Sequence, residues 1–175
     1  MTKVTENGWY LTDRVVHMTI AVGVDHRGFF IKPEIIEVLR KAGHRVLDLG
    51  TNSEEPVDYP DFSAAVGIAV AEGRADRGVI VCGSGVGACV AANKIHGVRA
   101  GMCHDTYSAH QGVEHDDMNV LCLGSGIVGI SLIEEVIRAF LGARFVDDEE
   151  RYVRRLRKVE ALECGDNGSR DRSAH

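Results

Sequence analysis

A cysteine and a glycine-rich loop are the first groups in this sequence that could do chemistry. Cys82 ends a continuously apolar run and is followed at once by residues 83–87, Gly-Ser-Gly-Val-Gly. Converging backbone N–H groups and a helix beginning just after such a loop can hold a phosphate or an oxyanion. A thiol near a helix N-terminus can have its pKa lowered, which makes the thiolate available as a base or a nucleophile. The alternatives are an ordinary tight turn and a Cys82 that is only a small buried hydrophobic residue.

Two further polar pairs could contact a substrate. Asp25 and His26 follow another apolar run. Either Asp25 orients His26, which then donates to substrate oxygens, or Asp25 caps the next turn and His26 is merely exposed. Arg151 and Arg155 are four residues apart and share one helix face, where guanidinium groups could bind phosphate. A charged helix face is more often only solvated. His115 resembles any histidine at a helix end.

The elements that must position these residues follow from hydrophobic periodicity. Apolar runs predict five strands, and amphipathic patterns between and after them predict helices, with Asp61 and Asp105 as N-caps. The predicted strands are residues 19–24, 44–49, 78–82, 98–103 and 119–123. This alternation predicts a Rossmann-like three-layer αβα sandwich around a five-stranded parallel sheet of order 2-1-3-4-5. Its switch point, where ligands bind, would bring residues 25–26 and 82–87 together.

The length of 175 residues predicts one α/β domain over residues 18–163, including a C-terminal helical arm from about residue 147. Residues 1–17 are expected to be a tail and residues 164–175 a disordered tail. The net charge of −6 argues against nucleic-acid binding, and no apolar stretch approaches a membrane span. Five cysteines without a Cys-x-x-Cys spacing predict neither a disulfide framework nor a metal site. We expect a cytoplasmic protein.

Several segments together resemble the ribose-5-phosphate isomerase B family, which includes galactose-6-phosphate isomerase subunits. The matching segments occur in the family's order and are residues 23–28, 58–60, 81–87, 91–94, 97–100 and 114–121. The resemblance implies an aldose–ketose isomerase of carbohydrate metabolism that works through an enediolate, without metal or cofactor. It also implies a homodimer, or a dimer of dimers, with active sites shared between subunits. The best-fitting substrate pair is ribose 5-phosphate and ribulose 5-phosphate of the pentose phosphate pathway.

The resemblance also implies roles for single residues. Cys82 would be the base, Ser84 would line the loop that steadies the enediolate, and His115 would be the acid that helps open the sugar ring. One branch of the family uses a Glu just past the loop, but Ala88 places this chain with the cysteine type. The expected substrate-binding residues are Asp25, His26, Tyr59, Gly83, Gly85, Val86, Gly87, Asp116, Arg151 and Arg155.

Three departures from the family pattern bear on the substrate. Asp116 stands where many relatives have Asn, Gly126 where many have a substrate-binding Arg, and Tyr152 where a histidine is common. Each lost charged hydrogen bond should weaken phosphate binding by about 1–3 kcal/mol. Alternatively, the substrate is another four- to six-carbon sugar phosphate or has different hydroxyl stereochemistry.

Two other functions compete with this interpretation. Gly83-x-Gly85-x-x-Ala88 fits a dinucleotide fingerprint, with Asp105 as a ribose ligand, and would make the chain a non-catalytic nucleotide-binding module. That fingerprint normally follows the first strand, however, and here it follows the third. A silent partner subunit of a two-chain isomerase is the other alternative, against which the presence of Cys82 and His115 counts.

Overall fold

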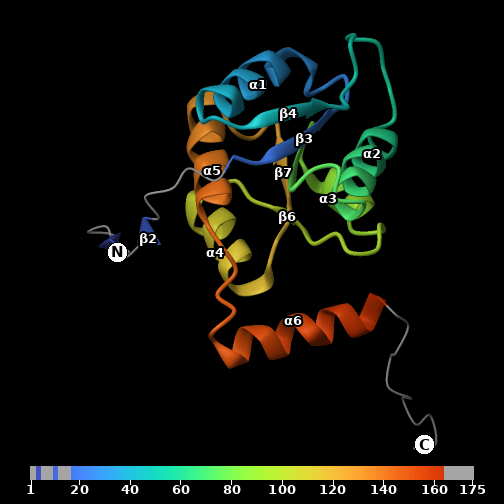
Figure 1. Ribbon diagram of the computed structural model, residues 1–175. Helices are drawn as coiled ribbons and strands as arrows, with labels where there is room; N and C mark the ends of the chain where they lie inside the picture. The colour runs from blue at the N-terminus through green and yellow to red at the C-terminus, as the bar shows by residue number, and fades with distance from the viewer. Residues whose placement is uncertain (1–2, 5–9, 12–16, 164–175) are drawn as a thin grey trace, which may run out of the picture.

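The sheet of the protein has five parallel strands, as predicted. The computed structural model describes residues 3–4, 10–11 and 17–163 (Figure 1). The sheet strands are β3 (Thr19–Val24), β4 (Arg45–Asp48), β5 (Arg77–Cys82), β6 (Ala100–Met102) and β7 (Val120–Gly124). Within the first 17 residues the described parts are β1 (Lys3–Val4) and β2 (Tyr10–Leu11), which pair antiparallel, and His17. The rest of the predicted N-terminal tail and all of the predicted C-terminal tail lie outside the described residues.

The strand order differs from the predicted 2-1-3-4-5. The observed order is β4-β3-β5-β7-β6, which is 2-1-3-5-4 in chain order, so β7 lies between β5 and β6. All five residues of β7 are buried, whereas the three residues of β6 are half-buried or exposed. The more apolar and longer strand therefore takes the inner position, and the short strand becomes the edge, where a partly polar environment suffices.

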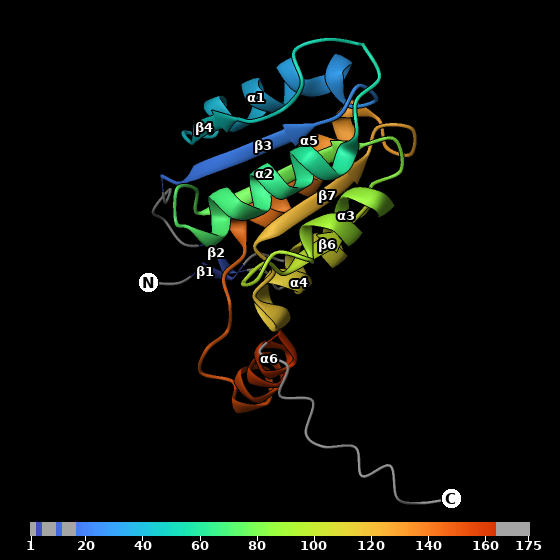
Figure 2. The ribbon, with the colours of Figure 1, turned by 90° about the vertical axis from the view of Figure 1, so that its right-hand side faces the viewer.

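This order decides which helices cover each face of the sheet. Right-handed crossovers place α4 (Thr106–Asp116) on the same face as α1 (Lys32–Lys41) and α5 (Ile130–Gly142), since the connection from β6 to β7 runs back across the sheet. The buried residues of these three helices form one core with the strands. The opposite core is covered by α2 (Tyr59–Ala71) and α3 (Val86–Ala92), the face seen in Figure 2.

The last helix, α6 (Glu150–Glu163), is the predicted C-terminal arm and lies beyond the β6 end of the sheet (Figures 1 and 2). A cavity of about 670 Å³ separates it from that edge. Only one residue of α6, Tyr152, is buried. Tyr152 holds the N-terminal part of the helix, and at its C-terminal end the Glu163 carboxylate accepts the Gly97 N–H at 3.0 Å.

Local sequence accounts for most helix starts. Asp105 caps α4 as predicted, because its carboxylate accepts the Ser108 N–H at 2.7 Å. The predicted cap Asp61 is wrong: α2 begins two residues earlier, at Tyr59, with Pro60 in its first turn. Proline is well placed there because the first helical N–H groups have no partner within the helix. Within the described residues, no helix is long and apolar enough to cross a membrane.

Candidate active site

The C-terminal edge of the sheet holds Cys82 at the end of β5, with only 4% of the residue exposed. The Gly85 N–H donates to the Cys82 Sγ at 3.1 Å. Gly85 has φ +83°, a left-handed conformation that glycine adopts without strain, and this bend turns its N–H back toward the sulfur. The sequence-predicted thiol and loop are thus brought together.

The turn after β3 forms one side of this edge. The Asp25 carboxylate is buried and accepts the backbone N–H groups of Arg27, at 2.8 Å, and Gly28, at 3.1 Å. Asp25 therefore caps the turn, and the hydrogen bonds of its carboxylate go to the turn rather than to His26. The ring of His26 is held instead by Val57, whose N–H donates to Nδ1 at 3.2 Å. In the neutral ring the proton is then on Nε2, which can donate to a ligand.

The loop after β7 lies directly beside the glycine loop, because Gly124 pairs with Cys82 in register. The Ser125 N–H donates to the Cys82 carbonyl at 2.9 Å, and the Gly126 N–H donates to the Gly83 carbonyl at 3.0 Å. A side chain on Gly124 would place its Cβ 2.7 Å from the Ser84 backbone. Glycine at this position lets the two loops touch.

Gly87 of the loop meets Tyr59 at the start of α2. A Cβ on Gly87 would lie 2.7 Å from the Tyr59 ring, so the ring covers this part of the loop. The Ser84 hydroxyl accepts the Val86 N–H at 3.3 Å. The structure therefore gathers Asp25, His26, Tyr59, Cys82 and residues 83–87 around one edge of the sheet.

The other predicted residues form a second cluster around the end of α4 and the start of α6. The rings of His115 and Tyr152 stack with centroids 4.0 Å apart and planes 20° apart. The Gln111 amide donates to the His115 Nδ1, which leaves Nε2 as the proton-bearing atom of the neutral ring. The Arg151 guanidinium lies over the Tyr152 ring and donates to its hydroxyl at 2.7 Å.

Two predicted residues complete this second cluster. Asp116 is exposed and lines the cavity between α6 and the β6 edge. Arg155 is exposed one helical turn after Arg151. Tyr152 was noted in the sequence only as a departure from the family pattern. In the structure it is the 7%-exposed residue that joins α6 to His115.

The two clusters lie at opposite ends of the parallel strands. Cys82 pairs with Gly124 at the C-terminal end of β7, whereas His115 precedes Val120, where β7 begins. The strand between these ends is about 13 Å long, because each residue of a parallel strand adds about 3.3 Å. Within one chain, His115 and Cys82 therefore cannot act on the same carbon atoms.

Cys89 is a half-buried thiol on α3. Its pKa is lowered to about 7, chiefly by a hydrogen bond from the Cys122 thiol and further by the Met102 N–H and the Asn93 amide, against the opposing effect of burial. The Cys89 Sγ is 3.3 Å from the Ala100 carbonyl at the start of β6, away from the loop of Cys82. By contrast, burial raises the pKa of Cys103 to about 11.

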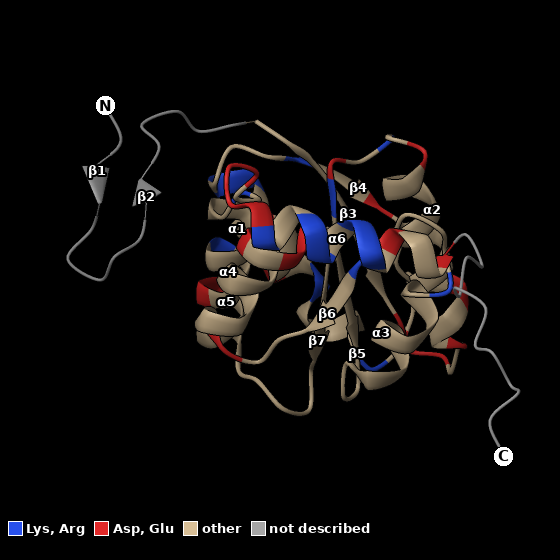
Figure 3. Ribbon diagram, turned by 90° about the horizontal axis from the view of Figure 1, so that it is seen from below, with Lys and Arg blue, Asp and Glu red and all other residues tan. Residues whose placement is uncertain are grey.

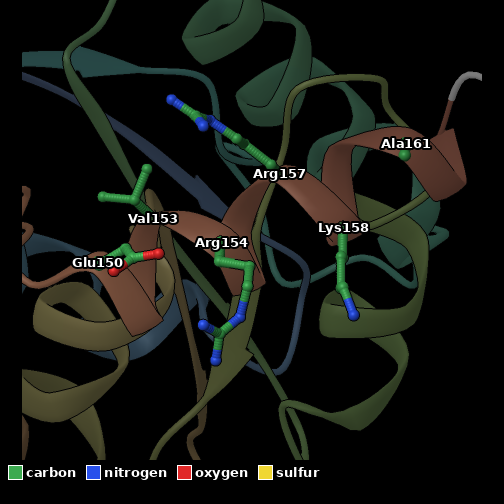
Figure 4. Close-up of a pocket in the computed structure, with 6 residues that line it drawn as sticks. All are labelled: Glu150, Val153, Arg154, Arg157, Lys158 and Ala161. Carbon is green, nitrogen blue, oxygen red and sulfur yellow. The ribbon is translucent and has the colours of Figure 1, made fainter.

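The outer side of α6 carries a separate basic surface (Figure 3). Arg154, Arg157 and Lys158 line a hollow of about 340 Å³ on this helix (Figure 4). Neither Arg151 nor Arg155, the pair predicted to bind phosphate, lines it. None of its lining residues belongs to the edge that holds Cys82.

Three residues near the predicted ones were missed from the sequence. Gln111 could have been found, because it lies four residues before His115 on one helix face. Ser125 contacts the Cys82 carbonyl only because β7 lies beside β5, which the predicted order did not give. Arg27 gave no signal beyond its place after His26, and its side chain lies over Gly83.

Comparison with known proteins shows the family of the chain. The model of the ribose/galactose isomerase family matches residues 20–159. The chain is 43% identical over 144 residues to ribose-5-phosphate isomerase B of Escherichia coli (82% of this chain, 95% of the relative). It is 37% identical over 130 residues to D-erythrulose-4-phosphate isomerase of Pectobacterium atrosepticum (73% and 85%).

A solved structure gives the same result. Ribose-5-phosphate isomerase B of Clostridium thermocellum superposes with a TM-score of 0.81 at 41% identity, covering 85% of this chain and 99% of that one. The residues matched by the family model include the five-stranded sheet apart from Thr19, both loops around Cys82 and most of α6. The chain belongs to the ribose/galactose isomerase family.

Proposed function

We propose that this protein, a sugar-phosphate aldose–ketose isomerase by its family, interconverts ribose 5-phosphate and ribulose 5-phosphate with Cys82 as the base. One observation carries the assignment of the base: the Cys82 Sγ accepts the Gly85 N–H at the C-terminal end of β5. This is the edge of a parallel sheet at which ligands bind. His26 and Tyr59 lie around the same loops and could contact substrate hydroxyls.

The proposed reaction needs one base and a stabilised oxyanion. The Cys82 thiolate takes the proton from the second carbon of the open-chain aldose, and the electron pair of that C–H bond forms the double bond of an enediolate. The hydroxyl proton then passes from the oxygen of the second carbon to that of the first. The Cys82 thiol returns its proton to the first carbon, which gives the ketose and restores the thiolate. Backbone N–H groups and Ser84 of the loop would stabilise the enediolate oxygen.

We also propose that each active site is completed by a second copy of the chain. His115 would open the sugar ring, and Arg151 and Arg155 would bind phosphate beside Asp116. The support is geometric, because this cluster lies about 13 Å or more from Cys82 within one chain. A symmetric dimer brings opposite ends of two copies together twice, which gives two equivalent sites. In this proposal, residues 18–163 act as one cytoplasmic domain.

The relatives leave a second substrate open. Relatives at similar identity bear the names D-erythrulose-4-phosphate isomerase and galactose-6-phosphate isomerase subunit LacB. Gly126 provides no side chain for phosphate, and Asp116 brings a negative charge to the second cluster. Another four- to six-carbon sugar phosphate is therefore the alternative substrate for the same chemistry.

The first experiment follows ribose 5-phosphate by proton NMR in heavy water. We expect conversion to the ketose, with deuterium at the second carbon of the aldose that re-forms. Cys82→Ala should abolish both conversion and exchange. Full activity of that variant would overturn Cys82 as the base. Activity only on a shorter or longer sugar phosphate would favour the alternative substrate.

A mixing experiment tests the shared site. Cys82→Ala and His115→Ala should each be inactive, since every site of each homodimer lacks one group. After dissociation and reassembly of an equal mixture, half of the dimers would contain one intact site. Activity should then recover to about one quarter of the unmodified protein. No recovery, with subunit exchange demonstrated by native mass spectrometry, would contradict a shared site.

A further inference from the structure

Arg27 has a fixed backbone and an exposed side chain at the edge that holds Cys82. Its N–H donates to the Asp25 carboxylate at 2.8 Å, and its carbonyl accepts the Ser125 hydroxyl at 2.8 Å. These bonds tie the turn after β3 to the loop after β7. The Cα of Arg27 is therefore held from two sides, although its side chain is exposed.

The side chain of Arg27 runs over the first residue of the glycine loop. A Cβ on Gly83 would lie 3.6 Å from the Arg27 Cγ and 3.7 Å from its Nε. Gly83 directly follows Cys82 and has no side chain to fill this space. The guanidinium is thus placed over the loop on which the proposed chemistry depends.

Within the described residues, the Arg27 guanidinium has no ion pair or hydrogen bond. Other arginines of the fold are committed to structural partners: Arg77 donates to the Phe140 and Ala143 carbonyls, Arg99 pairs with Asp117, and Arg138 pairs with Glu134. An arginine that is positioned by its backbone and lacks a protein partner retains all its donors for a ligand.

No other permanent cation comes from the loops that meet here. Residues 25–28, 83–87 and 124–127 contain one Lys or Arg between them, which is Arg27. The loop after β7 contributes Gly126, which has no side chain. Because the chain has a net charge of −6, an anion at this edge needs a local positive charge.

We propose that Arg27 is the cation with which the chain that supplies Cys82 binds the phosphate of the substrate. This inference rests on the proposed function. The proposed phosphate ligands are then Arg151 and Arg155 from the second copy and Arg27 from the first copy. A phosphate dianion has enough oxygen atoms to accept hydrogen bonds from guanidinium groups on both sides.

The test compares Arg27→Ala and Arg27→Lys with Arg40→Ala. Arg40 is an exposed arginine on α1 with no side-chain partner in the described structure, so its variant changes the net charge equally. We expect Arg27→Ala to raise KM by about 10–100-fold, which corresponds to the loss of one charged hydrogen bond, while kcat stays within about threefold of the unmodified protein. The inhibition constant of inorganic phosphate should rise similarly. Arg27→Lys should restore much of both, and Arg40→Ala should change neither.

Direct binding of inorganic phosphate, followed by ³¹P NMR titration, separates this inference from the proposed function. If the unmodified protein isomerises no sugar phosphate, the proposed function fails, but weaker phosphate binding by Arg27→Ala would still support the cation site. If the unmodified protein is active and Arg27→Ala binds phosphate and substrate normally, this inference is wrong. A fall in kcat with unchanged KM would also overturn it, since Arg27 would then act on the enediolate.

Discussion

Replacing Gly85 with alanine tests the loop geometry on which the candidate site depends. The residue has φ +83°, and a Cβ would lie 3.0 Å from the Leu123 carbonyl carbon, 3.1 Å from the Met102 Cγ and 3.2 Å from the Gly124 nitrogen. Two of these three atoms belong to the backbone of β7 and cannot rotate away. The matched control is Gly73, which has φ +70° and no atom within 4 Å of its Cβ position.

The control separates the cost of the left-handed backbone from the cost of crowding. The left-handed conformation costs an alanine about 1–2 kcal/mol, partly offset by about 0.4–1 kcal/mol from the stiffer unfolded chain. Gly73→Ala should therefore lose about 1 kcal/mol of unfolding free energy. Gly85→Ala should lose about 1–3 kcal/mol more, because two backbone segments must move apart. For a domain of this size, 1 kcal/mol lowers Tm by about 2–4 °C.

Gly85→Ala should also reduce turnover, since the N–H of residue 85 donates to the Cys82 Sγ. Losing a hydrogen bond to a charged group, about 1.5–3 kcal/mol, lowers kcat by about 10–150-fold. The measurements are urea unfolding and steady-state isomerisation of both variants at one temperature. Equal stability losses for Gly85→Ala and Gly73→Ala would refute the crowding argument. A Gly85→Ala variant that unfolds at lower urea but turns over normally would refute the role of the N–H.

Three further predictions concern other described contacts. Because the pKa of Cys89 is lowered to about 7, the rate of its alkylation by iodoacetamide should be half-maximal near pH 7 and constant above about pH 8. Peptide mapping measures this rate, and a rate that still rises tenfold per pH unit above pH 8 would contradict the prediction. Lys32→Met should cost about 2–4 kcal/mol in urea unfolding, because it leaves the partly hydrated Asp48 carboxylate and a buried carbonyl without their cation. Asp117→Gly should be about 1 kcal/mol more stable to unfolding than Asp117→Ala, because residue 117 has φ 49°, which glycine adopts more readily than alanine. Both variants lose the ion pair with Arg99, so that loss cancels in the comparison. Equal stabilities would show that the backbone angle carries no cost.

The sequence predicted the strands and most helices because their apolar periodicity is local. It could not predict that β7 lies between β5 and β6, since that depends on how two apolar strands compete for an inner position. The residues of β7 are all buried, whereas Gly101 of β6 leaves space that the Met118 sulfur fills. The order of β6 and β7 in the sheet therefore depends on how deeply each strand is buried, which the apolar periodicity of the sequence does not show.

The candidate site was predicted unevenly for the same reason. Cys82 and its loop are adjacent in sequence, so their meeting at one edge followed from the alternation of strands and helices. The stacking of Tyr152 on His115 joins residues far apart in the chain, and no local pattern indicates it. Arg27 was missed because one arginine after a histidine is ordinarily only solvated. Its role becomes visible only when its contact with Gly83 is known.

The inner position of β7 has a consequence for synthesis of the chain. The ribosome completes β5 at Cys82 well before β7, which ends at Gly124, and β6 emerges between them. At about 5–20 residues per second, roughly forty residues take about 2–8 s to add. During that interval the edge of β5 is unpaired, and the earlier strand β6 is the parallel strand available beside it. The nascent protein must keep this position open until its most apolar late strand arrives.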